Sequence, residues 1–489
     1  MVSRFGHGRP TARFRADSPV VARESRLVGT RWSSWSVRLR SLRHSVRGRV
    51  DAIVARIARI DTVRLLIVGY LSYVLAGWLA LALPWSRQGE GVSLLDHLFI
   101  SASAVSTTGL TSVSTSGTYS WFGELVVLLL IQFGGLGYMT LSSFMVLAVS
   151  GGLTPLRDRV TRVTLALPQG FEPVAFLRLI VRFTLAIEAI GAVLLYPSFV
   201  ASGAPDPIWQ SIFHSVSAFC TAGFGLYDDS LERFRSDLWL NSVVTVLSVS
   251  GAIGFIVMHD VSLSLRNRRP HVTLTSKVIL WSTFWIIAIG TLLFATEEPT
   301  VRNLPLLERW SASLFQVMSA STTVGFNTLP IGPLSSASLY LLALVMLIGA
   351  SPSGTGGGLK TTTFSALWAE MTSVVRRRNV TTFLGKAIPE VRMRAAVAGM
   401  MLYAMTLAIG IYALALVESS PLPDLMFEAA SALGTVGLSR GITASLTPTG
   451  KCILIALMFV GRVGPVVIGM SFFVSRPETT AEETQDVAI

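Results

Sequence analysis

One twelve-residue pattern occurs four times in this chain of 489 residues. It reads Phe, three residues, Ser-Ala, two residues, Thr, one residue, Gly, and then Leu or Phe. Each copy lies between two long apolar stretches. Four short helices that each end in Thr-x-Gly favour a four-fold arrangement around one axis, and in a membrane such a ring can form a cation filter. The copies cover residues 99–110, 213–224, 315–326 and 427–438.

The composition indicates an all-α polytopic membrane protein whose main solvent is the lipid bilayer. Hydrophobic residues make up 51% of the chain and charged residues only 14%, and the mean hydropathy is +0.60. A water-soluble protein of this length needs a more charged surface. Two cysteines cannot form a disulfide framework. The sequence carries no HExxH or CxxC motif and no cluster of acid, base and nucleophile, so we do not expect an enzyme.

The motif divides the chain into four units of outer helix, re-entrant pore helix with filter strand, and inner helix. Because each unit contains two spans, it begins and ends on the same side of the membrane, so the repeats are parallel and surround one central pore. The expected domains are a basic tail at 1–63, repeats at 64–150, 151–265, 266–378 and 379–475, and a tail at 476–489. The spans are expected at about 64–85, 122–149, 176–200, 238–262, 276–296, 338–375, 393–417 and 449–475.

Positive charge predicts the orientation. Residues 1–64 contain fifteen arginines and four acidic residues, which accounts for +11 of the net charge of +12 (15 − 4 = 11). We interpret this segment as a cytoplasmic tail; a helix on anionic lipid and an organelle transit peptide are alternatives. Arginines also follow the inner helices, so both termini are predicted to be cytoplasmic, in the cell (plasma) membrane. The rest of the chain is nearly neutral, so nucleic acid is not an expected partner.

The filter is expected to use backbone carbonyls, which replace the water around a cation without adding a fixed charge. Aligning consecutive carbonyls requires unusual backbone angles that glycine adopts at low cost. The threonine hydroxyls are expected to tie each strand to its own pore helix, and the four motif phenylalanines to pack the helices in place. Small residues that merely permit close helix packing are the alternative. The filter residues are Thr107, Thr108, Gly109, Thr221, Ala222, Gly223, Thr323, Val324, Gly325, Thr435, Val436 and Gly437.

Each inner helix also carries a glycine 24 to 28 residues after the filter glycine. Only the third inner helix is expected to be interrupted, at 349–363, where Pro352 removes a helix donor and five glycines weaken the helix. Unwound backbone at this depth is a candidate gate. A plain helix kink is an alternative. A phosphate-binding loop is not expected, because that motif needs Gly directly before Lys and here Leu359 lies between them. The gate residues are Gly349, Gly354, Gly356, Gly357, Gly358 and Lys360, and the inner-helix glycines are Gly134, Gly251, Gly349 and Gly461, with Gly137, Gly254 and Gly464 shortly after.

Arg462 lies in the middle of the last span. A central arginine costs about 2.5–3.5 kcal/mol to insert, so it should face a partner or water. We expect its guanidinium to hold carbonyls of the gate loop and to act as a gate residue; a purely structural arginine is the alternative. Glu188 is expected to pack or to pair with Arg182, and His259-Asp260 to be solvated at a helix end.

These motifs resemble the Trk/Ktr/HKT superfamily of potassium transporters over residues 64–475. The four filter glycines, the break GTGGGLKTTT and the arginine motif GRVGP are most similar to the Ktr-type (KtrB-like) membrane subunit. Trk-type subunits usually carry two further N-terminal spans, and residues 1–63 are too charged to supply them.

The resemblance implies the ion-translocating membrane subunit of a potassium uptake system, with K+ as the transported ion and Na+ as a candidate activator. It also implies a homodimer with one pore per subunit and a cytosolic nucleotide-binding regulatory ring of the KtrA/TrkA kind. The alternative function is a cation carrier or another polytopic membrane protein without a filter-type pore.

Overall fold

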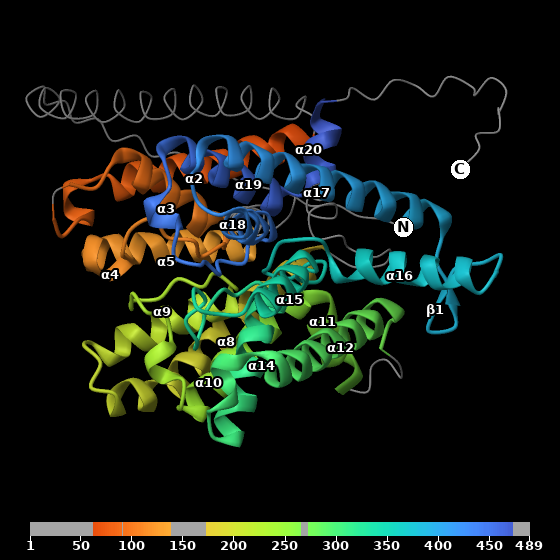
Figure 1. Ribbon diagram of the computed structural model, residues 1–489, viewed down its shortest axis with the longest axis horizontal. Coiled ribbons are helices and arrows are strands. Elements are labelled where there is room, and N and C mark those ends of the chain that lie inside the picture. The colour runs from red at the N-terminus through yellow and green to blue at the C-terminus, as the bar shows by residue number, and fades with distance from the viewer. Residues whose placement is uncertain (1–61, 90, 138–172, 266–271, 473–489) are drawn as a thin grey trace, which may run out of the picture. The chain divides into compact units, whose positions relative to one another are not determined.

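The computed structural model describes residues 62–89, 91–137, 173–265 and 272–472. The described part is almost entirely helical, which confirms the all-α expectation (Figure 1). The two expected tails lie outside the described residues, apart from 62 and 63. Within the described residues, strands β1 (Thr382–Phe383) and β2 (Lys386–Ala387) form an antiparallel hairpin.

The helices follow one order four times. The outer helices are α2 (Thr62–Leu81), α8 (Pro173–Ala201), α12 (Leu274–Glu297) and α17 (Glu390–Val417). The motif helices, here called pore helices, are α3 (Leu94–Ser106), α9 (Pro207–Phe219), α14 (Leu306–Thr322) and α18 (Leu422–Gly434). The inner helices begin as α5 (Trp121–Leu136), α10 (Leu238–Ile253), α15 (Ser336–Leu347) and α19 (Pro448–Val463). The shorter elements are η1 (Pro84–Ser86), α4 (Thr115–Thr118), η2 (Glu232–Phe234), α11 (Phe255–Leu265), α13 (Pro299–Arg302), α16 (Thr361–Val375), η3 (Thr443–Ser445) and α20 (Pro465–Phe472).

Several helices have the length and composition of membrane spans. Three described helices are long and apolar enough to cross a bilayer, at Leu177–Ala201, Leu274–Glu297 and Glu390–Val417. A fourth span is possible if the bent pair α10 and α11 crosses as one unit. The sequence predicts eight spans, of which only 338–375 is interrupted. Within the described residues, the inner helices α10 and α19 are also broken into shorter pieces. The apolar helices support a multi-pass membrane protein.

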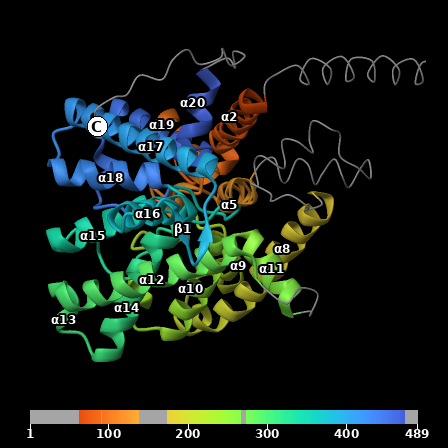
Figure 2. The ribbon, with the colours of Figure 1, turned by 90° about the vertical axis from the view of Figure 1, so that its right-hand side faces the viewer.

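The packing of the helices is cyclic. Each outer helix packs on the pore helix that follows it, as α2 does on α3 and α8 on α9. Each inner helix packs on the pore helix of the next unit: α5 on α9, α10 on α14, α15 on α18, and α19 back on α3. Accordingly, α17, α18 and α19 lie together in both views, as do α10, α12 and α14 (Figures 1 and 2). This order brings the ends of the four pore helices toward one another.

The expectation that only the third inner helix is interrupted was wrong. The chain bends by 97° between α10 and α11 at Gly254, and α19 ends at Gly464 before α20 begins. Helix α5 ends at Gly137, and the residues after it are not described. All three glycines have positive φ, between 76° and 96°, an angle that stops a right-handed helix and that glycine adopts readily.

The four motif phenylalanines fill the space around the pore helices, as the sequence predicted. Phe99, Phe213, Phe315 and Phe427 are each at most 2% exposed. They join apolar side chains of the surrounding helices in the hydrophobic core. Buried aromatic side chains contribute much of the packing area of a core, so these residues hold the pore helices in position.

A buried carboxylate joins the outer and inner helices of the third unit. Glu298 caps α13 by accepting from the Thr300 backbone N–H at 3.1 Å. Its other oxygen accepts from the backbone N–H and hydroxyl of Ser335 at 3.1 and 2.8 Å, where α15 begins. Burial by itself raises the pKa of Glu298, but these bonds and one from Ser338 outweigh it, so the pKa lies below its ordinary value of 4.5.

We expect Glu298→Gln to lower the free energy of unfolding by about 1–2 kcal/mol, because hydrogen bonds to a charged group are lost. A folded-state pKa below the unfolded value means that this contribution is present above pH 4.5 and is lost as the pH falls below it. Thermal unfolding of the purified protein in detergent measures both effects. The exposed neighbour Glu297→Gln is the matched control, and equal melting temperatures for the two variants would contradict the prediction.

Candidate functional site

A threonine at the end of each pore helix, or one residue beyond it in α9, adopts the left-handed backbone region. The φ angles of Thr107, Thr221, Thr323 and Thr435 are 52°, 51°, 61° and 51°, which is uncommon for a β-branched residue. The next residue returns its N–H to a carbonyl inside the helix, as Thr108 does to Ser103 O at 2.9 Å. The chain therefore turns sharply out of each helix at the same motif position, and all four threonines are fully buried.

The four motif glycines meet in a closed ring. A Cβ added to Gly109 would lie 2.4 Å from Ala222 O, and one added to Gly223 would lie 2.3 Å from Val324 O. A Cβ added to Gly325 would lie 2.0 Å from Val436 O, and one added to Gly437 would lie 2.1 Å from Thr108 O, which closes the ring. The backbone carbonyl before each glycine therefore lies directly against the glycine of the preceding strand, which leaves no room for a side chain.

The ring presents uncharged oxygen atoms in a buried setting. Four backbone carbonyls from the same motif position can replace the water around a monovalent cation. The C-terminal ends of the four pore helices precede these strands, and the partial negative charge of a helix C-terminus favours a cation nearby. The predicted filter residues are thus brought together.

Motif serines tie three of the four strands to their pore helices, whereas Ser217 Oγ has no hydrogen-bond partner within the described residues. Ser103 Oγ accepts from Gly109 N at 3.1 Å, and Ser431 Oγ accepts from Gly437 N at 3.0 Å. Ser319 Oγ donates to Phe326 O at 2.5 Å. The expected threonine tie occurs in the first copy, where Thr108 Oγ1 lies 2.6 Å from Ser106 Oγ of its own pore helix. The invariant Ser-Ala pair within the motif was the available sequence signal.

The predicted gate loop lies against the threonines at the inner end of this ring. Thr355, which was not singled out from the sequence, makes most of the contacts. Its Oγ1 donates to Phe219 O at 3.1 Å and lies 3.1 Å from Thr221 Oγ1, and its carbonyl lies 3.4 Å from Thr107 Oγ1. A Cβ added to Gly356 would lie 2.3 Å from Thr323 Oγ1.

The loop also reaches the fourth strand. A Cβ added to Gly357 would lie 2.2 Å from Thr435 Oγ1, and one added to Gly358 would lie 2.9 Å from Gly349 Cα. Lys360 Nζ donates to Gly356 O at 2.9 Å. Gly354 packs on α10, with its added Cβ 2.5 Å from Ala252 O. The loop thus contacts filter threonines from all four strands, and its glycines are required by close backbone approach.

Arg462 joins three segments at this point. Its Nη1 donates to Thr107 Oγ1 at 3.0 Å and to the loop carbonyl of Thr355, and its Nη2 donates to Gly134 O on α5. The expectation that the guanidinium contacts a loop carbonyl agrees with this geometry. A planar guanidinium is suited to several fixed acceptors at once.

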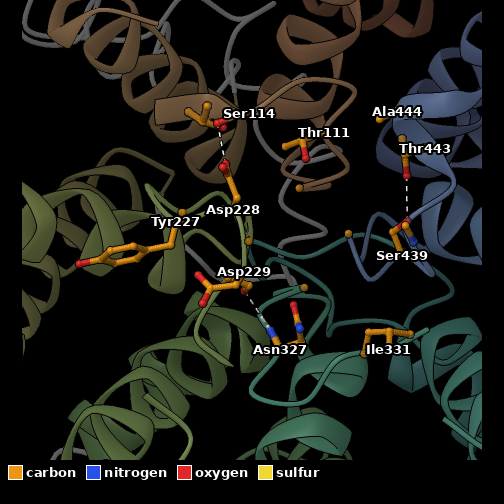
Figure 3. Close-up of a pocket in the computed structure, with 18 of the residues that line it drawn as sticks. Thr111, Ser114, Tyr227, Asp228, Asp229, Asn327, Ile331, Ser439, Thr443 and Ala444 are labelled. Atoms are coloured by element: carbon orange, nitrogen blue, oxygen red, sulfur yellow. Dashed lines mark hydrogen bonds between the residues drawn. The ribbon is translucent and has the colours of Figure 1, made fainter. Parts of the chain in front are cut away.

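A cavity of about 490 Å³ lies on the opposite side of the ring (Figure 3). All four filter glycines line it, together with Asp228, Asp229, Glu232 and Arg440. Polar contacts join neighbouring units around its wall: Ser114 Oγ donates to Asp228 Oδ1 at 2.5 Å, Asn327 Nδ2 donates to Glu232 Oε1 at 2.8 Å, and Arg440 Nη2 donates to Gly332 O at 2.8 Å. A Lys451–Asp96 ion pair of 2.8 Å joins the fourth unit to the first.

Glu188 packs in the interior, as one of its two expected roles requires, but it does not pair with Arg182, and the expected solvation of Asp260 was wrong. Arg182 is exposed whereas Glu188 is buried, and the Glu188 carboxylate lies 3.6 Å from Cys220 Sγ. Six residues apart on one helix, the two side chains point to different faces. Asp260 is buried as well, and it accepts from the Ser276 hydroxyl at 2.7 Å at the start of α12.

The apolar helices and the buried carbonyl ring define a polytopic membrane transport protein. Comparison with known proteins agrees: residues 74–483 match the family model TrkH, described as cation transport protein. The chain belongs to this family of cation transporters and is not an enzyme.

Individual relatives cover most of the chain. It is 33% identical to the Ktr system potassium uptake protein B of Bacillus subtilis, over 86% of this chain and 94% of that protein. It is 34% identical to the potassium/sodium uptake protein NtpJ of Enterococcus hirae, over 85% of this chain and 94% of that protein. The crystal structure of the potassium transporter TrkH from Vibrio parahaemolyticus has the same fold, with a TM-score of 0.67, 21% identity and coverage of 84% and 85%.

Proposed function

We propose that this chain is the ion-translocating membrane subunit of a potassium uptake system and that K+ crosses the ring of backbone carbonyls. The observation that carries the proposal is a single cavity lined by all four motif glycines, each packed on a carbonyl of the next strand. The names of the similar proteins from B. subtilis and E. hirae favour potassium as the ion. The proposed architecture is four parallel repeats, at 64–150, 151–265, 266–378 and 379–475.

In this proposal the loop at 349–363 and Arg462 form the gate. The loop contacts filter threonines of all four strands, so an ion leaving the ring would meet loop backbone. Arg462 donates to the Thr355 carbonyl, which supports a role in holding the loop closed. Displacing the loop would require breaking this bond and the contact of Thr355 with Thr221.

The proposal extends to assembly and location. The subunit would work in the plasma membrane as a homodimer with both termini in the cytoplasm, together with a cytosolic nucleotide-binding regulatory ring. The description of relatives as parts of a Ktr system supports a multi-component assembly. Na+ is the candidate activator, which the name of the potassium/sodium uptake relative favours.

The test is expression in cells that lack their own K+ uptake systems. We expect growth to be restored at low K+, and K+ uptake to be measurable with and without added Na+. Comparing K+ uptake with and without Na+ tests whether Na+ activates transport. An expressed, membrane-inserted protein that supports no K+ uptake, even with its regulatory partner co-expressed, would contradict the proposed function.

A further inference from the structure

One position behind the filter differs chemically among the four motif copies. The residue directly after the motif phenylalanine is fully buried in every pore helix, so it faces the interior of the protein. An apolar side chain at this place needs no partner, whereas a polar one does. The four residues are Ile100, His214, Gln316 and Glu428.

Glu428 binds the strand that leaves the fourth part of the filter. Its Oε1 accepts from the Ser439 hydroxyl, and its Oε2 accepts from Thr443 Oγ1 at 3.0 Å. The two hydroxyls also lie 2.9 Å apart, as Figure 3 shows. Ser439 is two residues beyond the filter glycine Gly437. The carboxyl group therefore holds the segment from Ser439 to Thr443 from behind.

Within the described residues, the other copies lack this anchor. Ile100 has no polar group. Gln316 has no hydrogen-bond partner for either side-chain atom. His214 Nδ1 lies 2.9 Å from Gln210 O in its own helix, while Nε2 has no partner in this part of the chain. The third exit strand is held instead from the cavity side, where Asn327 donates to Glu232.

The segment that Glu428 holds also carries the arginine at the outer cavity. Arg440 follows Ser439, pairs with Asp424 and donates to Gly332 O in the third unit. Ser439 and Arg440 both line the cavity above the ring. A shift of Ser439 would therefore move both the filter strand and a fixed positive charge at its outer mouth.

We propose that Glu428 is a positioning residue that fixes the fourth filter strand and thereby sets the preference of the pore among monovalent cations. This inference rests on the proposed function. Glu428 offers one oxygen acceptor to each of the two hydroxyls, whereas an amide has a single oxygen, so the strand is held more tightly here than by an amide. Discrimination between K+ and Na+ depends on where the carbonyl oxygens can lie, and a looser strand accommodates the smaller ion more easily.

The test is the ratio of K+ to Na+ uptake in the Glu428→Gln variant, at equal amounts of protein in the membrane. We expect this ratio to fall about fivefold, because glutamine has one oxygen acceptor where glutamate has two, and one hydrogen bond is worth about 1 kcal/mol. Thr443→Val removes one donor and should lower the ratio too, and the double variant should show less than the sum of the two effects. Gln316→Leu changes the same position of the third copy and should leave the ratio unchanged.

The outcomes separate this inference from the proposed function. Suppose that Gly437→Ser abolishes the preference for K+ over Na+ while Glu428→Gln and Thr443→Val keep it. The proposed role of Glu428 is then contradicted, and the proposed filter is still supported. If none of these variants changes selectivity, the filter assignment itself fails. An equal fall in the K+/Na+ uptake ratio in Gln316→Leu would also overturn the inference, because any substitution behind the filter would then reduce the preference for K+. Should Glu428→Gln not reach the membrane, Thr443→Val carries the test alone.

Discussion

Replacing Gly437 with serine should reduce K+ uptake about 10- to 100-fold and remove the preference for K+ over Na+, because the new side chain overpacks the ring. Its Cβ would lie 2.1 Å from Thr108 O and 3.0 Å from Gly109 Cα. Both obstacles are backbone atoms of the first strand, which cannot rotate away as a side chain can. The φ of +94° adds backbone strain for any L residue. Uptake and competition by Na+ in K+-uptake-deficient cells measure the effect.

Gly441→Ser is the matched control for this prediction. Gly441 lies four residues further along the same segment and has nearly the same backbone angle, with a φ of +91°. Nothing lies within 4 Å of its added Cβ. It therefore carries the same backbone strain without the clash, and we expect uptake and selectivity close to those of the unmodified protein. If the two serine variants behave alike, strain and not the ring geometry explains the loss at Gly437.

Replacing Arg462 with alanine should raise basal K+ flux about tenfold and uncouple it from the proposed regulatory partner, since each lost charge-assisted bond is worth about 1.5–3 kcal/mol. The substitution leaves the carbonyls of Thr355 and Gly134 without their donor. The gate loop then loses its tie to the fourth inner helix. Ion flux into liposomes that contain the purified subunit, with and without the partner, measures the change.

Arg462→Lys distinguishes two ways in which the arginine could act. Lysine keeps the positive charge but lacks the planar fork that reaches Thr355 and Gly134 together. If the side chain holds the loop, Arg462→Lys should resemble Arg462→Ala. If it acts only as a positive barrier, Arg462→Lys should resemble the unmodified protein. Unchanged flux and unchanged regulation in Arg462→Ala would remove the gating role altogether.

The helical fold and the order of its elements could be predicted from local pattern. Long apolar runs define the outer helices, and the ends of the motif helices coincide with the threonines of the repeated pattern. The sequence does not predict all the breaks in the inner helices. Gly254 and Gly464 belong to the repeated inner-helix glycines, yet a single glycine inside an apolar run predicts a bend only weakly. At Gly254 close packing also requires glycine, since a Cβ there would meet Pro352 O at 2.7 Å.

In the candidate site, too, some features could be predicted from the sequence and others could not. The residue types of the filter strands were predictable because close backbone approach requires glycine. The partner of each hydroxyl was not predictable, since Ser103, Thr107 and Thr108 are neighbours in sequence and differ only in the direction of their side chains. Thr355 was overlooked among glycines that appeared more distinctive. Glu428 differs from its counterparts in sequence, but its importance depends on contacts with Ser439 and Thr443 that appear only after folding.

By itself, the sequence determined that this protein is helical, lies in a membrane and repeats one twelve-residue motif four times. These properties follow from composition, from apolar periodicity and from the local need for glycine, so they can be recognised without knowing any distant contact. Only the tertiary structure decided how the strands close into a ring and which groups surround it. Arg462 meets Thr107 and Gly134 across 355 and 328 residues of chain. No local pattern can specify such pairings, because they depend on how all the helices pack at once.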